Sequence, residues 1–245
     1  MHVTVLGTGA AHTTGERYQT GILLEAGDQA LLVDAGNGVF QRLAQVGQSP
    51  EAIDTLLLTH LHLDHVADLS SIVKARVLAD RPNFSVIGPP GTKATLDQLL
   101  AIDDLGERAD IDVTEIEPGS HTVAGFDIRA VETDHSEYCL AYRFGDRFVF
   151  SGDTEANQAV AQLADGCEVL LHDCAYRDSH SDPSNHPTPT SLGRTLYEEN
   201  IEIDELYLTH LYPNAAGAVE ELRSTVASYV DAAVHVPSDM DVLLS

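Results

Sequence analysis

Three histidines and an aspartate fall within six consecutive positions of this chain, in the order His60, His62, Asp64 and His65. Imidazole and carboxylate are groups that zinc binds well, and manganese and iron also accept them. His60 and His62 lie two positions apart, so both can point the same way and bind one ion. Asp64 and His65 are turned aside and are better placed for a second ion. A solvated loop would explain a single histidine, whereas this density of ligand types predicts a metal site.

The residues on either side of the cluster indicate how it is positioned. The apolar run Leu56-Leu57-Leu58 precedes it and predicts a buried strand, so the ligands would stand at the carboxyl end of that strand. Beyond His65 the sequence predicts a helix that ends before Pro82. Its apolar residues recur at helical spacing: Val66, Leu69, Val73 and Val77.

Three other predicted strands also end near residues of ligand type. Strand 128–131 leads to His135, strand 148–150 to Asp153, and strand 205–208 to His210. If these strands share one sheet edge their ends converge, and open α/β sheets bind ligands at such edges. Taken singly, Asp153 could cap the following helix, and the two histidines could be ordinary loop residues. Together with the cluster at 60–65, the three complete two coordination shells.

The remaining pattern predicts an α/β protein. Its length suits one large domain covering residues 1–245. Strands come first and alternating elements later, which predicts two sheets covered by helices. Further strands are expected at 3–6, 21–25, 30–33, 84–87, 113–116, 140–144, 168–171 and 232–236, and further helices at 39–46, 92–100, 155–164, 189–200 and 215–229.

A second pair of polar residues has the chemistry of proton transfer. Asp173 follows the strand at 168–171, and His186 precedes a helix for which Thr188 is the expected cap and Pro189 the first residue. A helix N-terminus favours a phosphate group. His186 could pair with Asp173 and donate a proton to a leaving oxygen. The alternative is a buried polar pair that only holds a loop.

Composition restricts the environment and the partners. The formal net charge is −26, from 39 acidic against 13 basic residues. Such self-repulsion is screened at molar salt, so we expect a halophilic cytoplasm. An acidic surface repels nucleic acid at low salt.

The sequence also bears on the location of the protein. No apolar stretch approaches the roughly 20 residues of a membrane span, and the strand-like start argues against a signal peptide. The three unpatterned cysteines fit free thiols in a reducing cytosol: Cys139, Cys167 and Cys174.

The order and spacing of the ligands resemble the metallo-β-lactamase superfamily. The matching pattern is His60-x-His62-x-Asp64-His65, followed by His135, Asp153 and His210. The resemblance implies an αββα four-layer sandwich and two divalent metal ions, zinc first, with manganese or iron as alternatives. It implies that His60, His62 and His135 bind one ion, that Asp64, His65 and His210 bind the other, and that Asp153 bridges them. Asp34 would fix a ligand imidazole from behind.

Within the superfamily the chain looks like ribonuclease Z. Asp173 and His186 match residues that assist phosphodiester cleavage there, and the segments at 6–11 and 140–144 are similar too. Two features depart from that branch. Asp173 stands where a glutamate is usual, and only seventeen residues separate His135 from Asp153, which leaves no room for the arm that grips tRNA. We therefore expect the chemistry of the branch on small phosphodiesters such as cyclic nucleotides, or possible RNA processing without the arm.

The expected mechanism uses a metal-bridging hydroxide as nucleophile. Asp64 would orient or deprotonate this nucleophile, and His186, supported by Asp173, would protonate the leaving group. Two alternatives stay open: a hydrolase of thioester, lactone or lactam substrates, and a metal-binding protein without turnover. The oligomeric state also stays open, with a homodimer as one possibility.

Overall fold

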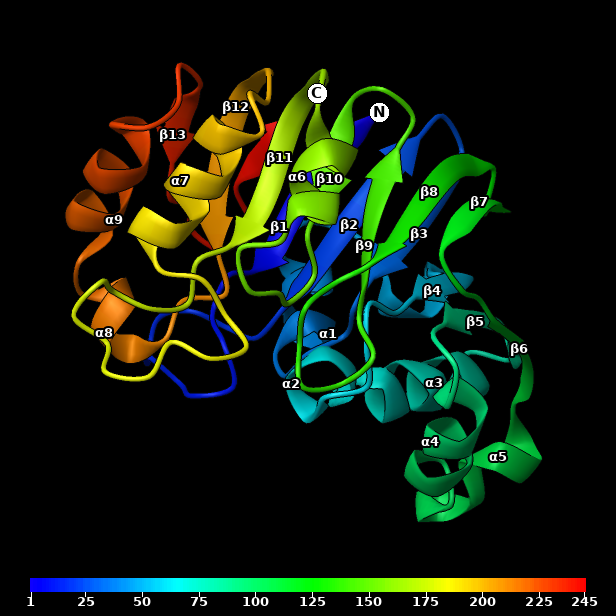
Figure 1. Ribbon diagram of the computed structural model, residues 1–245. Coiled ribbons are helices and arrows are strands. Elements are labelled where there is room, and N and C mark those ends of the chain that lie inside the picture. The colour runs from blue at the N-terminus through cyan, green and yellow to red at the C-terminus, as the bar shows by residue number, and fades with distance from the viewer.

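Two seven-stranded sheets lie face to face at the centre of the molecule, in a computed structural model that describes residues 1–245 (Figure 1). The first sheet has the order β14 (Val242–Leu244), β1 (His2–Gly7), β2 (Gly21–Ala26), β3 (Gln29–Val33), β4 (Thr55–Leu57), β5 (Asn83–Gly88) and β6 (Asp110–Glu115). The second has the order β13 (Ala233–His235), β12 (Ile203–Thr209), β11 (Cys167–Asp173), β10 (Phe148–Phe150), β9 (Leu140–Phe144), β8 (Phe126–Glu132) and β7 (Gly119–Val123). In each sheet one half is antiparallel, whereas the half from β3 to β6 or from β10 to β13 is parallel.

Helices cover the outer face of each sheet, which gives four layers (Figure 1). The first sheet is covered by α1 (Val39–Gln45), α3 (Leu69–Leu78) and α4 (Thr92–Leu99), and the second by α6 (Gln158–Ala164), α7 (Pro189–Glu198) and α9 (Val219–Ala227). Short turns of helix complete the chain: η1 (Pro50–Ala52), α2 (Leu63–Val66), η2 (Ile102–Asp104), α5 (Leu105–Arg108) and α8 (Pro213–Ala216). The predicted αββα sandwich is confirmed.

Burial on both faces explains why the strands are apolar throughout. In the first sheet, Val5 and Leu24 point into the layer between the sheets, whereas their neighbours Leu6 and Leu23 pack under the helices. Successive side chains of a strand point to opposite faces, so a strand with helices on one side and a sheet on the other needs apolar residues at every position.

Several predicted boundaries were wrong. The helix expected after His65 is interrupted between α2 and α3, because Asp68 forms hydrogen bonds with the turn between β3 and α1. Its carboxylate accepts hydrogen bonds from the backbone N–H groups of Gly38 and Phe40, at 2.8 and 2.9 Å. The helix expected at 215–229 is divided into α8 and α9 at residues 217–218. The sequence pattern also missed β7, β14 and α5.

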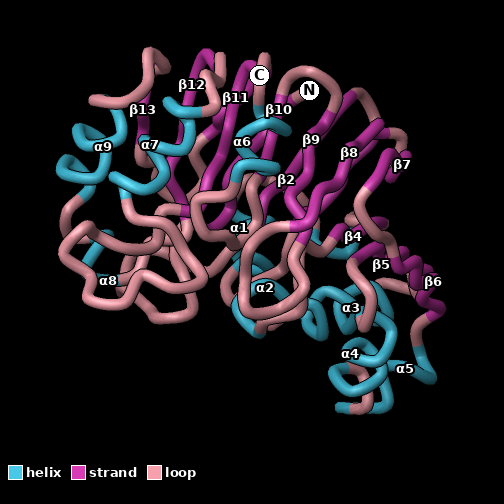
Figure 2. The backbone as a smooth tube through the Cα atoms, in the orientation of Figure 1, coloured by secondary structure: helices cyan, strands magenta, loops and turns pink.

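Long loops gather along one edge of the sandwich, between α8 and α2 (Figure 2). The carboxyl ends of β4, β10, β11 and β12 lead into this region, as the sheet-edge argument requires. All three cysteines are buried free thiols. None of the helices combines the length and the apolar character needed to cross a membrane.

Candidate metal centre

The first group of ligand residues collects around His62. His60 and His62 follow β4, His135 follows β8, and Asp153 follows β10. Nδ1 of His62 lies 3.0 Å from Nε2 of His60 and 3.1 Å from Nε2 of His135. Nε2 of His60 is 3.6 Å from Oδ2 of Asp153. One atom from each of the four side chains therefore points at a common centre.

The second group shares Asp153 with the first. Its other members are Asp64 and His65 in α2 and His210 after β12. Oδ2 of Asp153 lies 3.4 Å from Nε2 of His65 and 3.1 Å from Nε2 of His210. Oδ2 of Asp64 is 3.8 Å from each of these two nitrogens. In each group the candidate ligand atoms all lie within 4.8 Å of one another.

These distances fit divalent cations. Zinc binds imidazole nitrogen at about 2.0–2.1 Å, so two ligand atoms of a tetrahedral site lie about 3.3 Å apart. Nε2 of His65 is buried and has no hydrogen-bond partner in the protein. Buried polar atoms almost always have a partner, and a cation in the second group would satisfy this one. The seven residues stand in the two groups implied by the family resemblance, and their role as ligands stays a prediction.

In His65 and His210, the Nδ1 atom, which faces away from the ligand cluster, has a hydrogen-bond partner in the protein. Nδ1 of His65 donates to Oδ2 of Asp34 over 2.7 Å, and Asp34 in turn accepts hydrogen bonds from the backbone N–H and the hydroxyl of Thr59, each at 2.8 Å. The hydroxyl of Thr20 lies 3.1 Å from Nδ1 of His210. Such contacts fix the ring orientation and leave Nε2 free for a cation. Asp34 therefore stands where a supporting carboxylate was expected.

The buried carboxylates create a negative field in the centre. Burial lowers the pKa of His65, but the charges of Asp153 and Asp34 outweigh this effect and raise the pKa well above its usual value. Burial raises the pKa of Asp153, yet the imidazoles of His210, His65 and His60 hold it well below its usual range. The carboxylates thus favour positive charge in their midst, which bound cations would supply.

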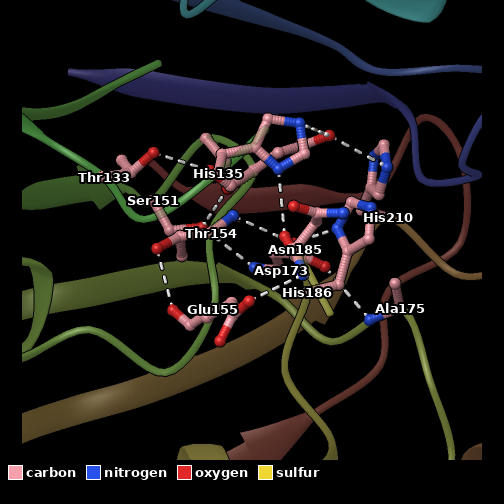
Figure 3. A network of polar contacts seen from close by, with 12 residues as sticks. Thr133, His135, Ser151, Thr154, Glu155, Asp173, Ala175, Asn185, His186 and His210 are labelled. Carbon is pink, nitrogen blue, oxygen red and sulfur yellow. Dashed lines mark hydrogen bonds and ion pairs between the residues drawn. The ribbon is translucent and has the colours of Figure 1, made fainter. Parts of the chain in front are cut away.

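Asp173 and His186 lie against the ligand cluster (Figure 3). Nδ1 of His186 donates to Oδ2 of Asp173 over 2.7 Å. The His186 ring stacks on His210, with centroids 5.1 Å apart, and lies 5.2 Å from the ring of His135. Burial lowers the pKa of His186, but the charge and hydrogen bond of Asp173 reverse the shift and raise it to about 9. The pair therefore forms a proton donor beside the candidate ligands.

Asn185 is a site residue that the sequence reasoning did not single out. Its carbonyl accepts a hydrogen bond from Nδ1 of His135 at 3.0 Å, and its N–H donates to Oε1 of Glu155 at 2.9 Å (Figure 3). Its φ is 68°, a left-handed conformation that asparagine adopts more readily than most residues. An asparagine directly before the candidate acid was the only available signal.

Asp153 does not cap the helix that follows it. The cap of α6 is Asn157, whose side chain accepts a hydrogen bond from the N–H of Val160 at 3.1 Å. The predicted cap of α7 is confirmed, because the Thr188 hydroxyl accepts from the N–H of Ser191 and Pro189 opens the helix. Asp153 is therefore free to face both ligand groups.

The site opens into a cleft of about 320 Å³. Burial raises the pKa of two tyrosines in its wall, Tyr176 and Tyr212, the latter to about 12. No lysine or arginine lines the cleft, whose residues are Ala11, His62, Leu63, Asp64, His135, Ser136, Asp153, Tyr176, Asn185, His186, His210 and Tyr212.

Comparisons with known proteins show that this fold and site are those of a metal-dependent hydrolase. Residues 1–188 match the family model described as Anti-Pycsar protein Apyc1. Ribonuclease Z of Mycolicibacterium gilvum (strain PYR-GCK) is 31% identical, over 98% of this chain and 94% of the relative. The metallo-β-lactamase fold protein YhfI from Bacillus subtilis has a TM-score of 0.85 at 23% identity and 99% coverage of both chains. Human tRNase Z, short form, has a TM-score of 0.78 at 20% identity, covering 100% and 99% of the two chains.

The chain therefore belongs to the Anti-Pycsar protein Apyc1 family and, with its ribonuclease Z relatives, to the ribonuclease Z-like branch of the metallo-β-lactamase superfamily.

Proposed function

We propose that this protein is a dinuclear metal-dependent phosphodiesterase that acts on small phosphodiesters. The observation that carries the proposal is the Asp173–His186 pair, which places a proton donor directly beside the candidate ligands. A thioester releases a thiolate, which leaves without protonation, so a thioester hydrolase has less need of a separate acid than an enzyme that must expel an alkoxide. Because the ligands come from both sheets, we infer that residues 1–245 work as one domain.

The seven clustered side chains would hold the metal. His60, His62 and His135 would hold one ion and Asp64, His65 and His210 the other, with Asp153 available to both groups. Zinc is the first choice for this mixture of imidazole and carboxylate, with manganese or iron as alternatives. Two bound divalent ions would supply a hydroxide near neutral pH and neutralise charge on the phosphoryl oxygens.

The chain's own residues would manage the protons. Asp64 lines the cleft and is placed to orient the nucleophile or accept its proton. His186 would donate its Nε2 proton to the leaving oxygen, while Asp173 fixes the ring through Nδ1. The pKa of about 9 would fall beside bound cations, which repel the charged imidazole, and so would approach the range in which an acid works at neutral pH.

Several features favour a small substrate over tRNA. Only seventeen residues separate His135 from Asp153, and they form β9, β10 and short loops, with no extended arm. The cleft contains no lysine or arginine side chain, and the net charge is −26. Because RNA binding depends on neutralising many phosphates, these features favour a substrate with a single phosphodiester, such as a cyclic nucleotide. The acidic excess and the three buried free thiols support a salt-rich cytoplasm as the location.

The proposal predicts hydrolysis of bis-p-nitrophenyl phosphate by the zinc- or manganese-loaded protein at high salt. Asp64→Asn and Asp153→Asn should reduce kcat by a factor of about 10³ or more, since each changes both metal binding and charge in the centre. His121→Ala, on the distant strand β7, should keep the activity of the unaltered protein. Turnover of a thioester or a β-lactam in place of the phosphodiester would contradict the proposal, as would full activity of either aspartate variant.

A second measurement isolates the role of His186. In His186→Ala, kcat should fall by a factor of about 10²–10⁴ with a poor leaving group such as an alkoxide, because general acid catalysis is lost. With p-nitrophenolate, which leaves without protonation, the loss should be much smaller. Equal losses with both leaving groups would assign His186 and Asp173 a purely structural role.

A further inference from the structure

Glu155 joins three loops that meet beside the candidate ligands. It lies two residues after Asp153, in the loop between β10 and α6, and its backbone N–H donates a hydrogen bond to the carbonyl of Asp134 at 2.8 Å. Its side-chain Oε1 accepts a hydrogen bond from the N–H of Asn185 at 2.9 Å (Figure 3). Glu155 belongs to neither ligand group, and the proposed reaction does not use it.

Asn185 connects Glu155 to His135. The Asn185 carbonyl can only accept a hydrogen bond, so Nδ1 of His135, 3.0 Å away, must carry the proton. The lone pair of His135 is then on Nε2, which lies 3.1 Å from Nδ1 of His62 and 3.9 Å from Oδ2 of Asp153. The direction of one backbone carbonyl therefore decides whether His135 presents a ligand atom to the cluster.

The backbone of Asn185 needs support to keep this direction. Its φ of 68° is left-handed, a conformation that is unfavourable for a residue with a side chain. Residues 181–184, which precede it, are exposed, so packing does not restrain the chain from that side. The hydrogen bond from the Asn185 N–H to Glu155 supplies the restraint.

Further hydrogen bonds fix the position of Glu155 relative to His135. The hydroxyl of Thr133 donates to the carbonyl of Asp153 at 2.8 Å, and the N–H of Asp134 donates to the hydroxyl of Thr154 at 3.3 Å. These contacts join segments 133–135 and 153–155 side by side. The Glu155 carboxylate is thus attached to the same support as the ligand that it would orient.

We propose that Glu155 is a positioning residue, which holds the carbonyl of Asn185 against Nδ1 of His135 and so keeps Nε2 directed at the metal. Contacts that orient ligands from outside the coordination shell strengthen metal binding. Because His186 directly follows Asn185, the same contact also places the candidate acid. The inference rests on the proposed metal centre and deepens it.

The first experiment measures the metal affinity of two variants by competition with a chelating dye. Glu155→Ala removes the acceptor and releases Asn185, so we expect one of the two ions to bind about tenfold more weakly or worse. Glu155→Gln removes the charge but keeps an oxygen at the same place, so it should retain most of the affinity. The control is Glu137→Ala, which removes an exposed glutamate from the loop after His135 and should bind metal like the unaltered protein.

The second experiment observes the imidazole itself in protein loaded with cobalt(II). The Nδ1 proton of a histidine bound to this paramagnetic ion through Nε2 gives a strongly shifted NMR signal, which exchanges with solvent. Glu155→Ala should speed the exchange of one such signal, that of His135. The signals of His65 and His210, which Asp34 and Thr20 hold, should not change. A general loss of stability would affect all of these signals alike.

Three results would overturn the inference. The first is equal metal affinity in Glu155→Ala and the unaltered protein, and the second is unchanged exchange of every shifted signal. The third is an equal loss in the Ala and Gln variants, because the negative charge and not the hydrogen bond would then be responsible. Failure of the unaltered protein to bind two metal ions would instead refute the proposed function itself.

Discussion

Asp34 and Asp153 are both buried carboxylates beside His65, yet they face it from opposite sides. Asp153 points at Nε2 of His65 from within the ligand cluster, whereas Asp34 holds Nδ1 from behind. Asp34 also accepts two hydrogen bonds from Thr59, the residue before His60. One carboxylate outside the ligand shell thus fixes residues that serve both groups.

This arrangement predicts that Asp34→Asn weakens metal binding without removing a ligand. An amide carries no negative charge, so its hydrogen bond to His65 is weaker and the imidazole becomes a poorer ligand. We expect a loss of about 10–100-fold in metal affinity, measured by competition with a chelating dye. Asp146→Asn, in which a side chain that is 99% exposed loses the same charge, should bind metal like the unaltered protein. An unchanged affinity in Asp34→Asn would show that His65 needs no support.

At the residue scale, the sequence was informative where chemistry depends on side-chain type. His60, His62, Asp64 and His65 stand out because ligand residues are so dense there. Asn185 could not be found in this way, because it holds His135 through a backbone carbonyl that every residue possesses. Only its left-handed backbone distinguishes it, and φ is not written in the sequence.

At the scale of elements, the position of α2 depends on a glycine. A Cβ at Gly36 would lie 2.1 Å from the backbone oxygen of Asp64. The turn after β3 therefore supports the short helix that carries Asp64 and His65, and Ala35 accepts a further backbone hydrogen bond from Asp68 at 2.9 Å.

We therefore expect Gly36→Ala to displace α2, lowering the free energy of unfolding by about 1–3 kcal/mol and weakening metal binding. Gly106→Ala in α5 is the matched control, because its new Cβ would approach no atom closer than 3.9 Å. That change should be neutral or slightly stabilising, since alanine favours helix more than glycine. Denaturant unfolding and a metal titration measure both effects. Equal stability of the two variants would mean that the turn after β3 can accommodate the added Cβ at little cost in the free energy of unfolding.

Most strands could be predicted from the sequence, whereas interruptions of helices could not. The parallel strands are apolar throughout because both of their faces are buried. Strand β7 escaped notice because it is largely exposed and polar, and β14 because it has only three residues. The break between α2 and α3 arises because Asp68 forms hydrogen bonds with the turn at Gly38 and Phe40, which is distant in sequence. Local helical periodicity cannot predict such a long-range contact.

At the scale of the whole molecule, the excess of acidic residues determines how stability depends on salt. A net charge of −26 on 245 residues means that the folded state repels itself in dilute buffer. The Debye length falls from about 10 Å at 0.1 M salt to about 3 Å at 1 M, so added salt should relieve most of this repulsion.

Thermal unfolding at increasing KCl tests this expectation. If screening contributes about 2 kcal/mol, Tm should rise by about 4–8 °C, and most of the rise should occur below 1 M. A Tm that begins to rise only beyond 1 M would point to exclusion of salt from the protein surface, and a constant Tm would contradict salt adaptation.

The adjacency of Asn185 and His186 has a consequence for how this protein can change. Asn185 anchors the candidate ligand His135 and the next residue is itself the candidate acid, so the spacing between this ligand and the proton donor is set within a single dipeptide. We expect segment 177–184, whose residues are mostly exposed, to tolerate changes in length and charge while that spacing persists. The proposed cleavage machinery would then be preserved while the loop beside the cleft diverges.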